Sequence, residues 1–373
     1  MNLIFSTDEF MLKGQAYAGF PILVDNKMNV VDQVLQFLIY HCITRGRVES
    51  KHTWKSHGQT MYDYFGFLEL HELSWKHYNF DDGHSVLAAY RDWSLSVFNL
   101  NPNTVNLRLN LIIKFYRFAH NKGWVDYLPY DIERIRANPR GGFLAHTDTS
   151  GGLRTSADVM LKSKHQPIKL LSKEQSRQFL TTIKNSTHYL VARLALHTGM
   201  RLEELVTFPC KYVVNPELSP NEKCFRITLD PKAMEIKGNK PRSIDIFPRM
   251  MADLFEYMVN ERHRLSGYTE SKHSNLFLSV EGKPYSRGGQ YFTSAWKGLD
   301  LSFSVTPHML RHTYATHTLY DMGKKNMPYA LLYVRDRLGH SSITTTQRYT
   351  HVINEYQDSM IDNYQEWIEE INN

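Results

Sequence analysis

Cysteines and long hydrophobic runs are scarce in this sequence of 373 residues. Its cysteines, Cys42, Cys210 and Cys224, lie far apart without a C-x-x-C pair, which argues against a disulfide scaffold or a zinc knuckle and favours buried free thiols. No apolar run reaches the length of a membrane span, and residues 1–10 lack the basic and then apolar layout of a secretory signal. We therefore expect a cytoplasmic protein, and no membrane partner.

The composition is that of a folded protein with a mild excess of positive charge. Lys and Arg number 44 against 38 Asp and Glu, a formal net charge of +6, and the length allows two or three domains. Such a balance suits a polyanionic partner without identifying one, because many basic proteins bind no nucleic acid.

The first half of the chain shows three successive patterns. Residues 1–27 contain short apolar runs broken by glycine and proline, which favours a small β element or an extended arm. Between 28 and 125 apolar residues recur at helical spacing, so this stretch predicts a compact helical domain. Between 126 and 167 the periodicity fades among glycines and cations, which indicates a basic linker between domains or a long ordered loop.

A second domain is expected from 168 to 351. Apolar residues alternate between 224 and 247, Met234 and Ile236 among them, and predict a small antiparallel sheet. The remainder is helical in pattern, so the predicted fold class is mainly α with a small antiparallel β-sheet. Residues 352–373 carry the apolar stripe of an amphipathic C-terminal helix.

Cations accompany the helical pattern and the turn of the predicted sheet. Placed between helices, they suit phosphate contacts, which position a DNA duplex without reading its sequence. A solvated helix face explains them equally well. The candidates for DNA contact are Arg45, Arg47, Lys51, Lys55, Arg108, Lys114, Arg117, Lys240 and Arg242.

Four segments carry residues suited to phosphate chemistry, and the first is TGMRLEEL. Its glycine turn ends one helix and presents Arg201 at the start of the next, where a guanidinium can fork onto phosphate oxygens. Glu204, one turn later, is placed to orient a neighbouring cation or imidazole. Alone, this segment is more typical of a surface salt bridge.

The second segment is the turn from Lys237 to Lys240, which holds ammonium groups at the tip of the predicted hairpin. A lysine there can protonate a departing oxygen. A lysine in a turn is nevertheless usually just solvated.

The third segment is HMLRHTYATH, in which His308 and Arg311 stand three residues apart and share a helix face. An imidazole and a guanidinium can then converge on one phosphate. His308 and His312 also have the spacing of paired zinc ligands. The inner Glu of H-E-x-x-H is missing, however, and no acidic third ligand is evident nearby, so we expect no metal.

The fourth segment places His340 after a glycine turn and Tyr349 nine residues later, in a run rich in serine and threonine. A tyrosine among polar residues is not an obvious core aromatic. Taken singly, a tyrosine is still structural more often than nucleophilic.

Together and in this order, the segments resemble the catalytic set of the tyrosine recombinases, the phage integrase family. The matching residues are Arg201 in TGMRLEEL, Lys237 in IKGNKPR, His308 and Arg311 in HMLRHTYATH, His340 in LGHSS and Tyr349 in QRYTH. The stretch 207–229 is longer than usual for the family, which leaves Lys232 and Lys240 as alternatives to Lys237.

The resemblance implies a site-specific recombinase that integrates, excises or transposes mobile DNA. Tyr349 would attack the DNA and form a 3′-phosphotyrosine, while Arg201 and Arg311 stabilise the charge that spreads over the phosphate oxygens. Lys237 would protonate the leaving 5′-oxygen, and His308 and His340 would serve proton transfer and phosphate binding. No metal, cofactor or ATP is expected.

The resemblance also implies how the domains are used. The region 28–125 is loosely similar to the family's helical, SAM-like core-binding domain, which with the catalytic domain forms a C-shaped clamp on duplex DNA. The C-terminal helix would dock on a neighbouring protomer of a homo-tetramer, although packing on its own core is the simpler alternative. The resemblance therefore implies a bacterial, DNA-associated protein that can act together with accessory DNA-bending factors.

Three other functions remain open at this stage. A type IB topoisomerase shares the Arg, Lys, His and Tyr chemistry but works as a monomer at random sequences. A DNA-binding architectural factor would have lost catalysis, against which the complete set argues. A zinc nuclease would use His308 and His312.

Overall fold

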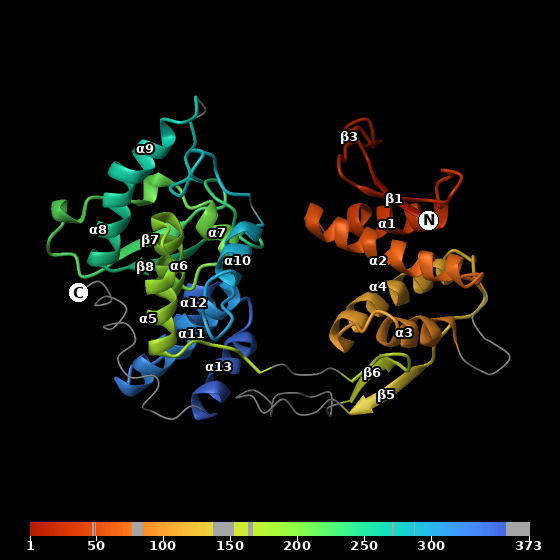
Figure 1. Ribbon diagram of the computed structural model, residues 1–373. Helices are drawn as coiled ribbons and strands as arrows, with labels where there is room; N and C mark the ends of the chain where they lie inside the picture. Colours follow the sequence, from red (N-terminus) through yellow and green to blue (C-terminus); the bar gives the residue numbers. More distant parts are fainter. Residues whose placement is uncertain are drawn as a thin grey trace. The chain divides into compact units, whose positions relative to one another are not determined.

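The computed structural model describes residues 1–46, 48, 50–76, 85–136, 153–162, 167–270, 272–286 and 288–355. The chain forms two compact units, Met1–Gln166 and Pro167–Asn373 (Figure 1).

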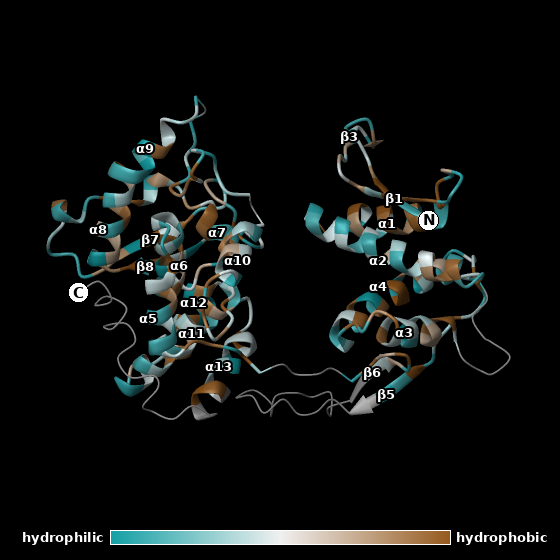
Figure 2. Ribbon diagram, viewed as in Figure 1, coloured by the Kyte–Doolittle hydropathy of each residue, from teal (hydrophilic) through white to brown (hydrophobic). Residues whose placement is uncertain are grey.

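The first unit is built on the helices predicted between residues 28 and 125. They are α1 (Asp32–Leu38), continued by the π-helical turn η1 (Ile39–Thr44), α2 (Lys51–Leu70), α3 (Val86–Ser96) and α4 (Pro102–Asn121). In Figure 2 apolar stretches alternate with polar ones along α2 and α4, as expected of helices with one buried face. Their buried sides meet in an aromatic core where the hydroxyls of Tyr64 and Tyr116 lie 2.6 Å apart.

The N-terminal residues form the small β element expected there. Strands β1 (Asn2–Phe5) and β4 (Pro21–Val24) pair antiparallel, as do β2 (Met11–Leu12) and β3 (Gln15–Ala16). Strand β4 packs on α2 at Gly58, where a Cβ atom would lie 2.3 Å from the Cβ of Pro21. Glycine at this helix position therefore permits the close approach.

The range 126–167 contains secondary structure that the expectation of a linker did not include. Strands β5 (Ile132–Arg136) and β6 (Leu153–Ala157) pair antiparallel, and Val159 is buried in the core of the first unit. The Asn106 side chain in α4 donates to the Leu161 carbonyl (2.8 Å) and accepts from the Leu161 amide (2.9 Å). These two hydrogen bonds fasten the chain at Leu161 to α4.

The second unit is mainly helical, as expected. Its first helix, α5, opens with the side chain of Ser172 capping the Gln175 amide at 3.1 Å. Helix α6 is buried along almost its whole length and packs on α11. The helices are α5 (Lys173–Thr182), α6 (Ser186–Thr198), α7 (Leu202–Val206), α8 (Pro248–Tyr257), η5 (Met258–Arg262), α9 (His263–Ser266), α10 (Gln290–Lys297), α11 (Pro307–Lys324), α12 (Ala330–Leu338) and α13 (Ile343–Glu355), with short 3-10 turns η3 (Cys210–Tyr212) and η4 (Pro216–Leu218).

The predicted sheet is present but shorter than its apolar pattern suggested. Strands β7 (Phe225–Leu229) and β8 (Arg242–Ile246) pair antiparallel. Met234 and Ile236, expected in a strand, are buried from the intervening loop instead. The reason is local, because the Asp230 carbonyl accepts from the Met234 amide (3.2 Å) and curls the chain away from the strand.

The cysteines, the absence of membrane spans and the C-terminal helix were also predicted from the sequence. The cysteines are free; Cys42 is buried, whereas Cys210 and Cys224 are only partly so. No helix in the described part of the chain is long and apolar enough to cross a membrane. Of the expected C-terminal helix, residues 352–355 belong to α13, and residues 356–373 lie outside the described part.

Candidate active site

A left-handed glycine presents Arg201 at the junction of α6 and α7. Gly199 ends α6 with φ +64°, and a Cβ atom there would lie 2.3 Å from the ring of Tyr314. Glycine is therefore required on both conformational and steric grounds. Arg201 is the N-cap residue directly before α7, and its amide donates to the Glu204 carboxylate at 2.7 Å.

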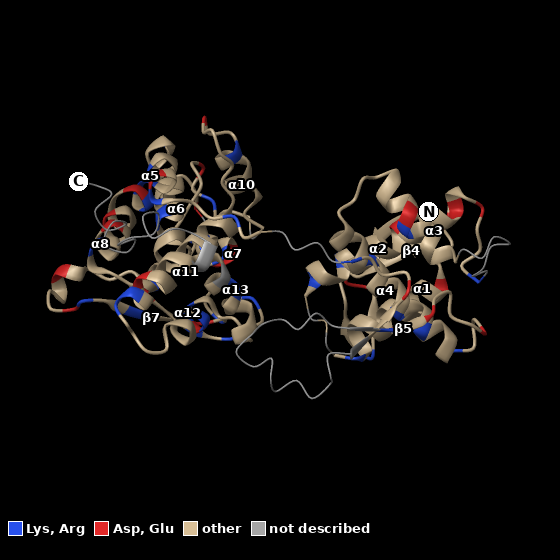
Figure 3. Ribbon diagram, turned by 90° about the horizontal axis from the view of Figure 1, so that it is seen from below, with Lys and Arg blue, Asp and Glu red and all other residues tan. Residues whose placement is uncertain are grey.

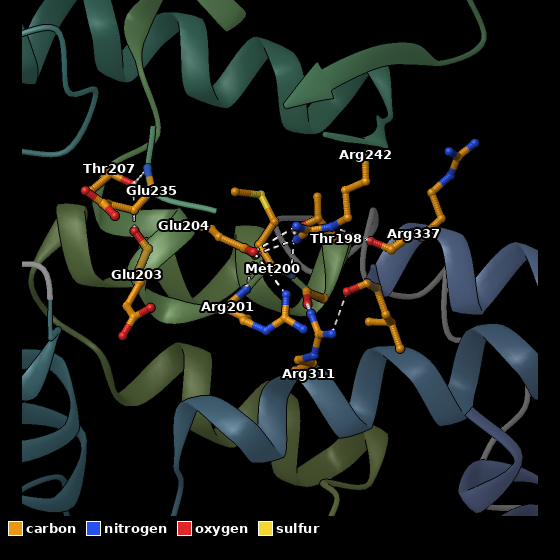
Figure 4. Close-up of polar contacts among 12 residues, drawn as sticks. Thr198, Met200, Arg201, Glu203, Glu204, Thr207, Glu235, Arg242, Arg311 and Arg337 are labelled. Atoms are coloured by element: carbon orange, nitrogen blue, oxygen red, sulfur yellow. Dashed lines mark hydrogen bonds and ion pairs between the residues drawn. The ribbon is translucent and has the colours of Figure 1, made fainter. Parts of the chain in front are cut away.

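Glu204 is the centre of a buried polar network that joins three elements (Figure 4). Its side chain is 1% exposed and accepts hydrogen bonds from Nη1 of Arg201 (3.1 Å) and Nη1 of Arg242 (2.8 Å). Burial raises the pKa of Glu204, but the hydrogen bonds and charges of Arg242 and Arg201 outweigh it and hold the pKa below its usual value. The carboxylate therefore stays ionised and fixes both guanidiniums.

Arg242 has a different place from the one we expected. Predicted to contact DNA, it is buried in strand β8, with two nitrogens donating to Glu204 and Nε donating to the Arg337 carbonyl at 2.9 Å. A Cβ atom on Gly339 would lie 2.7 Å from its Cδ. This guanidinium ties α7 to the end of α12 and does not face solvent, and a DNA contact of Arg242 stays a prediction.

Arg311 extends from α11 to the ends of two other helices. It is 4% exposed and donates to the Gly199 carbonyl at the end of α6 and to the Leu338 carbonyl at the end of α12, each at 2.7 Å. Burial, followed by the charge of Arg201, lowers the pKa of Arg311 to about 9. At neutral pH Arg311 stays charged. The two carbonyls that it contacts are uncharged, so they do not neutralise its positive charge.

His308 lies one turn before Arg311 on α11, near the predicted lysine turn. Desolvation lowers the pKa of His308, and the charges of Arg311 and Arg201 lower it further. Lys237 acts in the same direction from the turn at Gly238 (φ +79°) and Asn239 (φ +50°). The charge of Lys237 thus acts on His308.

His340 and Tyr349 stack in the same region. His340 follows Gly339, which ends α12 with φ +65°, and its Nδ1 lies 2.9 Å from the Thr346 hydroxyl. Its ring is nearly parallel to that of Tyr349, with 11° between the planes and 6.4 Å between the centroids. Desolvation, followed by the charges of nearby arginines, lowers the pKa of His340 to about 3, so its imidazole is neutral.

Tyr349 is buried in α13, 3% exposed, in an apolar cluster with residues of α11 and α12. Burial raises the pKa of its hydroxyl, and the charges of Arg311, Arg348 and Arg201 oppose that rise. The arginines thus offset part of the effect of burial, but the pKa of the Tyr349 hydroxyl stays above its usual value.

The contact between His312 and the Tyr349 hydroxyl was not predicted from the sequence. Nδ1 of His312 lies 3.0 Å from the Tyr349 hydroxyl, whereas the spacing of His312 from His308 suggested only a zinc ligand. Its position directly after Arg311 was the available signal. Among the described residues, no group of three or more His, Cys, Asp and Glu is placed to hold a metal ion.

Lys and Arg residues occur in both units (Figure 3). The cations proposed for DNA contact differ in their partners. Arg108 is ion-paired with Asp63 at 2.8 Å, and Arg117 donates to the Tyr130 hydroxyl at 3.0 Å. Lys114 and Arg117 line a cleft of about 250 Å³ between α4 and the β5–β6 pair. Arg47 lies outside the described residues. The exposed candidates are Arg45, Lys51, Lys55, Lys114, Arg117 and Lys240.

Comparisons with known proteins identify the family of this chain. A family model described as the phage integrase family matches residues 169–355. Tyrosine recombinase XerC of Lacticaseibacillus casei (strain BL23) is 37% identical over 296 residues, which cover 71% of this chain and 93% of the relative.

Solved structures show the same fold. A lambda integrase dimer bound to a COC' core site has a TM-score of 0.58 at 15% identity, covering 88% of this chain and 78% of the other. The Tn1549 transposon integrase in complex with a circular intermediate DNA has a TM-score of 0.55 at 17% identity, covering 85% and 94%. The chain belongs to the phage integrase family and is a tyrosine recombinase that cleaves and rejoins DNA at specific sites.

Proposed function

We propose that Tyr349 is the nucleophile and that Arg201 and Arg311 bind the scissile phosphate. The observation that supports this most strongly is that the guanidiniums of Arg201, at the start of α7, and Arg311, in α11, both act on the buried Tyr349 hydroxyl, with their charges opposing the rise in its pKa. Glu204 fixes Arg201, and two helix-end carbonyls fix Arg311, so little reorganisation is needed when a phosphate arrives.

In the proposed reaction the Tyr349 oxygen attacks phosphorus and the bond to the 5′-oxygen breaks, which leaves a 3′-phosphotyrosine. Lys237 gives a proton to the departing oxygen, and His308 and His340 hydrogen-bond the phosphate. We favour Lys237 over Lys232 and Lys240 because its charge reaches His308.

We propose that neither metal nor ATP takes part. Two guanidiniums supply the positive charge that a metal would otherwise bring, and the phosphotyrosine keeps the energy of the broken bond. A 5′-hydroxyl of another strand can then reverse the step and complete an exchange.

We propose recombination sites in duplex DNA as the partner, with the exposed cations of the first unit contacting its backbone. Relatives of the same fold are solved on a core site and on a circular DNA intermediate of a transposon, which supports a role in moving mobile DNA. A C-shaped clamp, a homo-tetramer joined by C-terminal helices and accessory DNA-bending factors complete the proposal, in the cytoplasm of a bacterium.

Covalent capture from a pool of random duplexes tests the proposal and selects the target sequence in the same experiment. Each duplex is nicked so that cleavage releases a short strand, and DNA that stays on the protein in detergent is sequenced. We expect the wild type to enrich one inverted-repeat sequence and Tyr349→Phe to capture none. Capture by Tyr349→Phe would contradict the assignment, and supercoil relaxation by a monomer at random sequences would favour a topoisomerase.

A further inference from the structure

The three histidines of the site, His308, His312 and His340, differ in what they contact. Nδ1 of His312 lies 3.0 Å from that oxygen. His340 stacks on the tyrosine ring and has its own Nδ1 beside the Thr346 hydroxyl. The ring of His308 packs on that of His312, with centroids 6.2 Å apart. Of the three, His312 is the one whose ring nitrogen is at hydrogen-bond distance from the reacting atom.

We infer that His312 is a further catalytic residue, the group that takes the proton from Tyr349 during attack, an inference that rests on the proposed function. The O–H bond of Tyr349 breaks, its proton binds the Nδ1 lone pair, and the oxygen forms a bond to phosphorus. The bond from phosphorus to the 5′-oxygen breaks, and Lys237 supplies the proton that this oxygen takes up. On rejoining, the attacking 5′-hydroxyl gives its proton to Lys237 and its oxygen bonds to phosphorus. The bond from phosphorus to the tyrosine oxygen then breaks, and His312 returns its proton to that oxygen.

The electrostatic surroundings keep the His312 ring neutral. Desolvation lowers the pKa of His312 to about 4, together with the charges of His308, Arg348 and Arg311. The neighbouring His340 is neutral as well. At neutral pH the His312 ring therefore keeps a lone pair free to accept a proton. A bound phosphate adds negative charge beside it and raises its pKa, so that the base becomes stronger when DNA is in place.

The helix also positions the two groups together. His312 directly follows Arg311 on α11, and the Arg311 guanidinium is anchored to carbonyls at the ends of α6 and α12. Helix α13, which carries Tyr349, packs on α11. The phosphate-binding cation and the proton acceptor are thus consecutive residues of one helix, so the proton acceptor is held in register with the phosphate.

His312→Asn tests the inference directly. Asparagine can still hydrogen-bond the tyrosine hydroxyl but cannot take its proton. With a duplex recovered by the capture selection, we expect covalent adduct formation to slow by about 10²-fold or more at neutral pH, with DNA affinity in gel-shift titrations unchanged. His263→Asn, at an exposed histidine of α9, is the matched control and should react like the wild type.

The leaving group separates the two proton transfers. In a duplex with a sulfur atom in place of the bridging 5′-oxygen, the departing thiolate needs no proton. Lys237→Ala should then regain near wild-type rates, whereas His312→Asn should stay slow. Added imidazole should restore part of the rate of His312→Gly, because it can occupy the vacated space and accept the proton.

Two results would overturn the inference. One is adduct formation by His312→Asn within about threefold of the wild-type rate; the other is its rescue by the sulfur substrate, which would assign His312 to the leaving group. If His312→Asn fails to fold, as judged by circular dichroism, the same rates are measured for His312→Gln. Failure of the wild type to form any adduct would instead contradict the proposed function.

Discussion

Replacing Arg242 by methionine tests whether one buried guanidinium holds two parts of the active site together. Arg242 donates two hydrogen bonds to Glu204, whose side chain is 1% exposed, and a third to the Arg337 carbonyl. Methionine keeps much of the aliphatic volume and removes the charge. The substitution leaves the Glu204 carboxylate buried with Arg201 still beside it.

The expected magnitude follows from that burial. Removing one partner of a buried ion pair costs about 3–5 kcal/mol, and the contact with Arg201 places this case near the lower end. A loss of about 3 kcal/mol corresponds to an increase of about 10²-fold in local opening. Helix α7 and the end of α12 should both be affected, because Arg242 contacts both.

Hydrogen exchange of the full chain, read peptide by peptide by mass spectrometry, measures the local opening of α7 and of the end of α12. Arg226→Met is the matched control, because Arg226 pairs with Asp245 across the same sheet but its side chain is 65% exposed. That pair is worth at most about 1 kcal/mol, so exchange should rise by less than about fivefold. Equal effects of the two substitutions would refute the role assigned to Arg242. Adding Glu204→Gln to Arg242→Met should recover part of the loss, since no buried charge is then left unpaired.

Three further predictions concern stability in urea or thermal unfolding. Gly199→Ala should destabilise the chain by about 2 kcal/mol or more, because φ is +64° and the new methyl group meets Tyr314; an unchanged midpoint would contradict this. In α2, Gly66→Ala should stabilise by about 0.5–1 kcal/mol, since nothing lies within 4 Å, whereas Gly58→Ala should destabilise by meeting Pro21. The folded-state pKa of Glu204 lies below its usual 4.5, so its stabilising contribution is present above that value and is lost as the pH falls through the folded-state pKa. The difference in unfolding free energy between wild type and Glu204→Gln should therefore shrink on acidification, and a constant difference would contradict the ion pair.

Local patterns predicted much of the site. The glycine turn before Arg201 and the helix shared by His308 and Arg311 follow from spacing and turn chemistry, and the structure contains both. The apolar periodicity likewise predicted the helices of the first unit, because a buried helix face repeats every three or four residues whatever it packs against.

Contacts between distant segments could not be predicted in the same way. Arg242 looks like any cation after a hairpin turn, and its burial depends on Glu204, 38 residues earlier. The sequence around His312 does not distinguish it from a solvated histidine, because its partner Tyr349 lies 37 residues later in the chain. Strands β5 and β6 were missed because their charged residues do not alternate with apolar ones.

Mapping the covalent bond itself is the most direct test of the central claim. After capture on a selected duplex and digestion with nuclease and protease, mass spectrometry locates the tyrosine that carries the residual nucleotide. The proposed function predicts a single modified peptide, with the 3′-phosphate on Tyr349. A nucleotide on any other residue, or cleavage that leaves no covalent adduct, would contradict it.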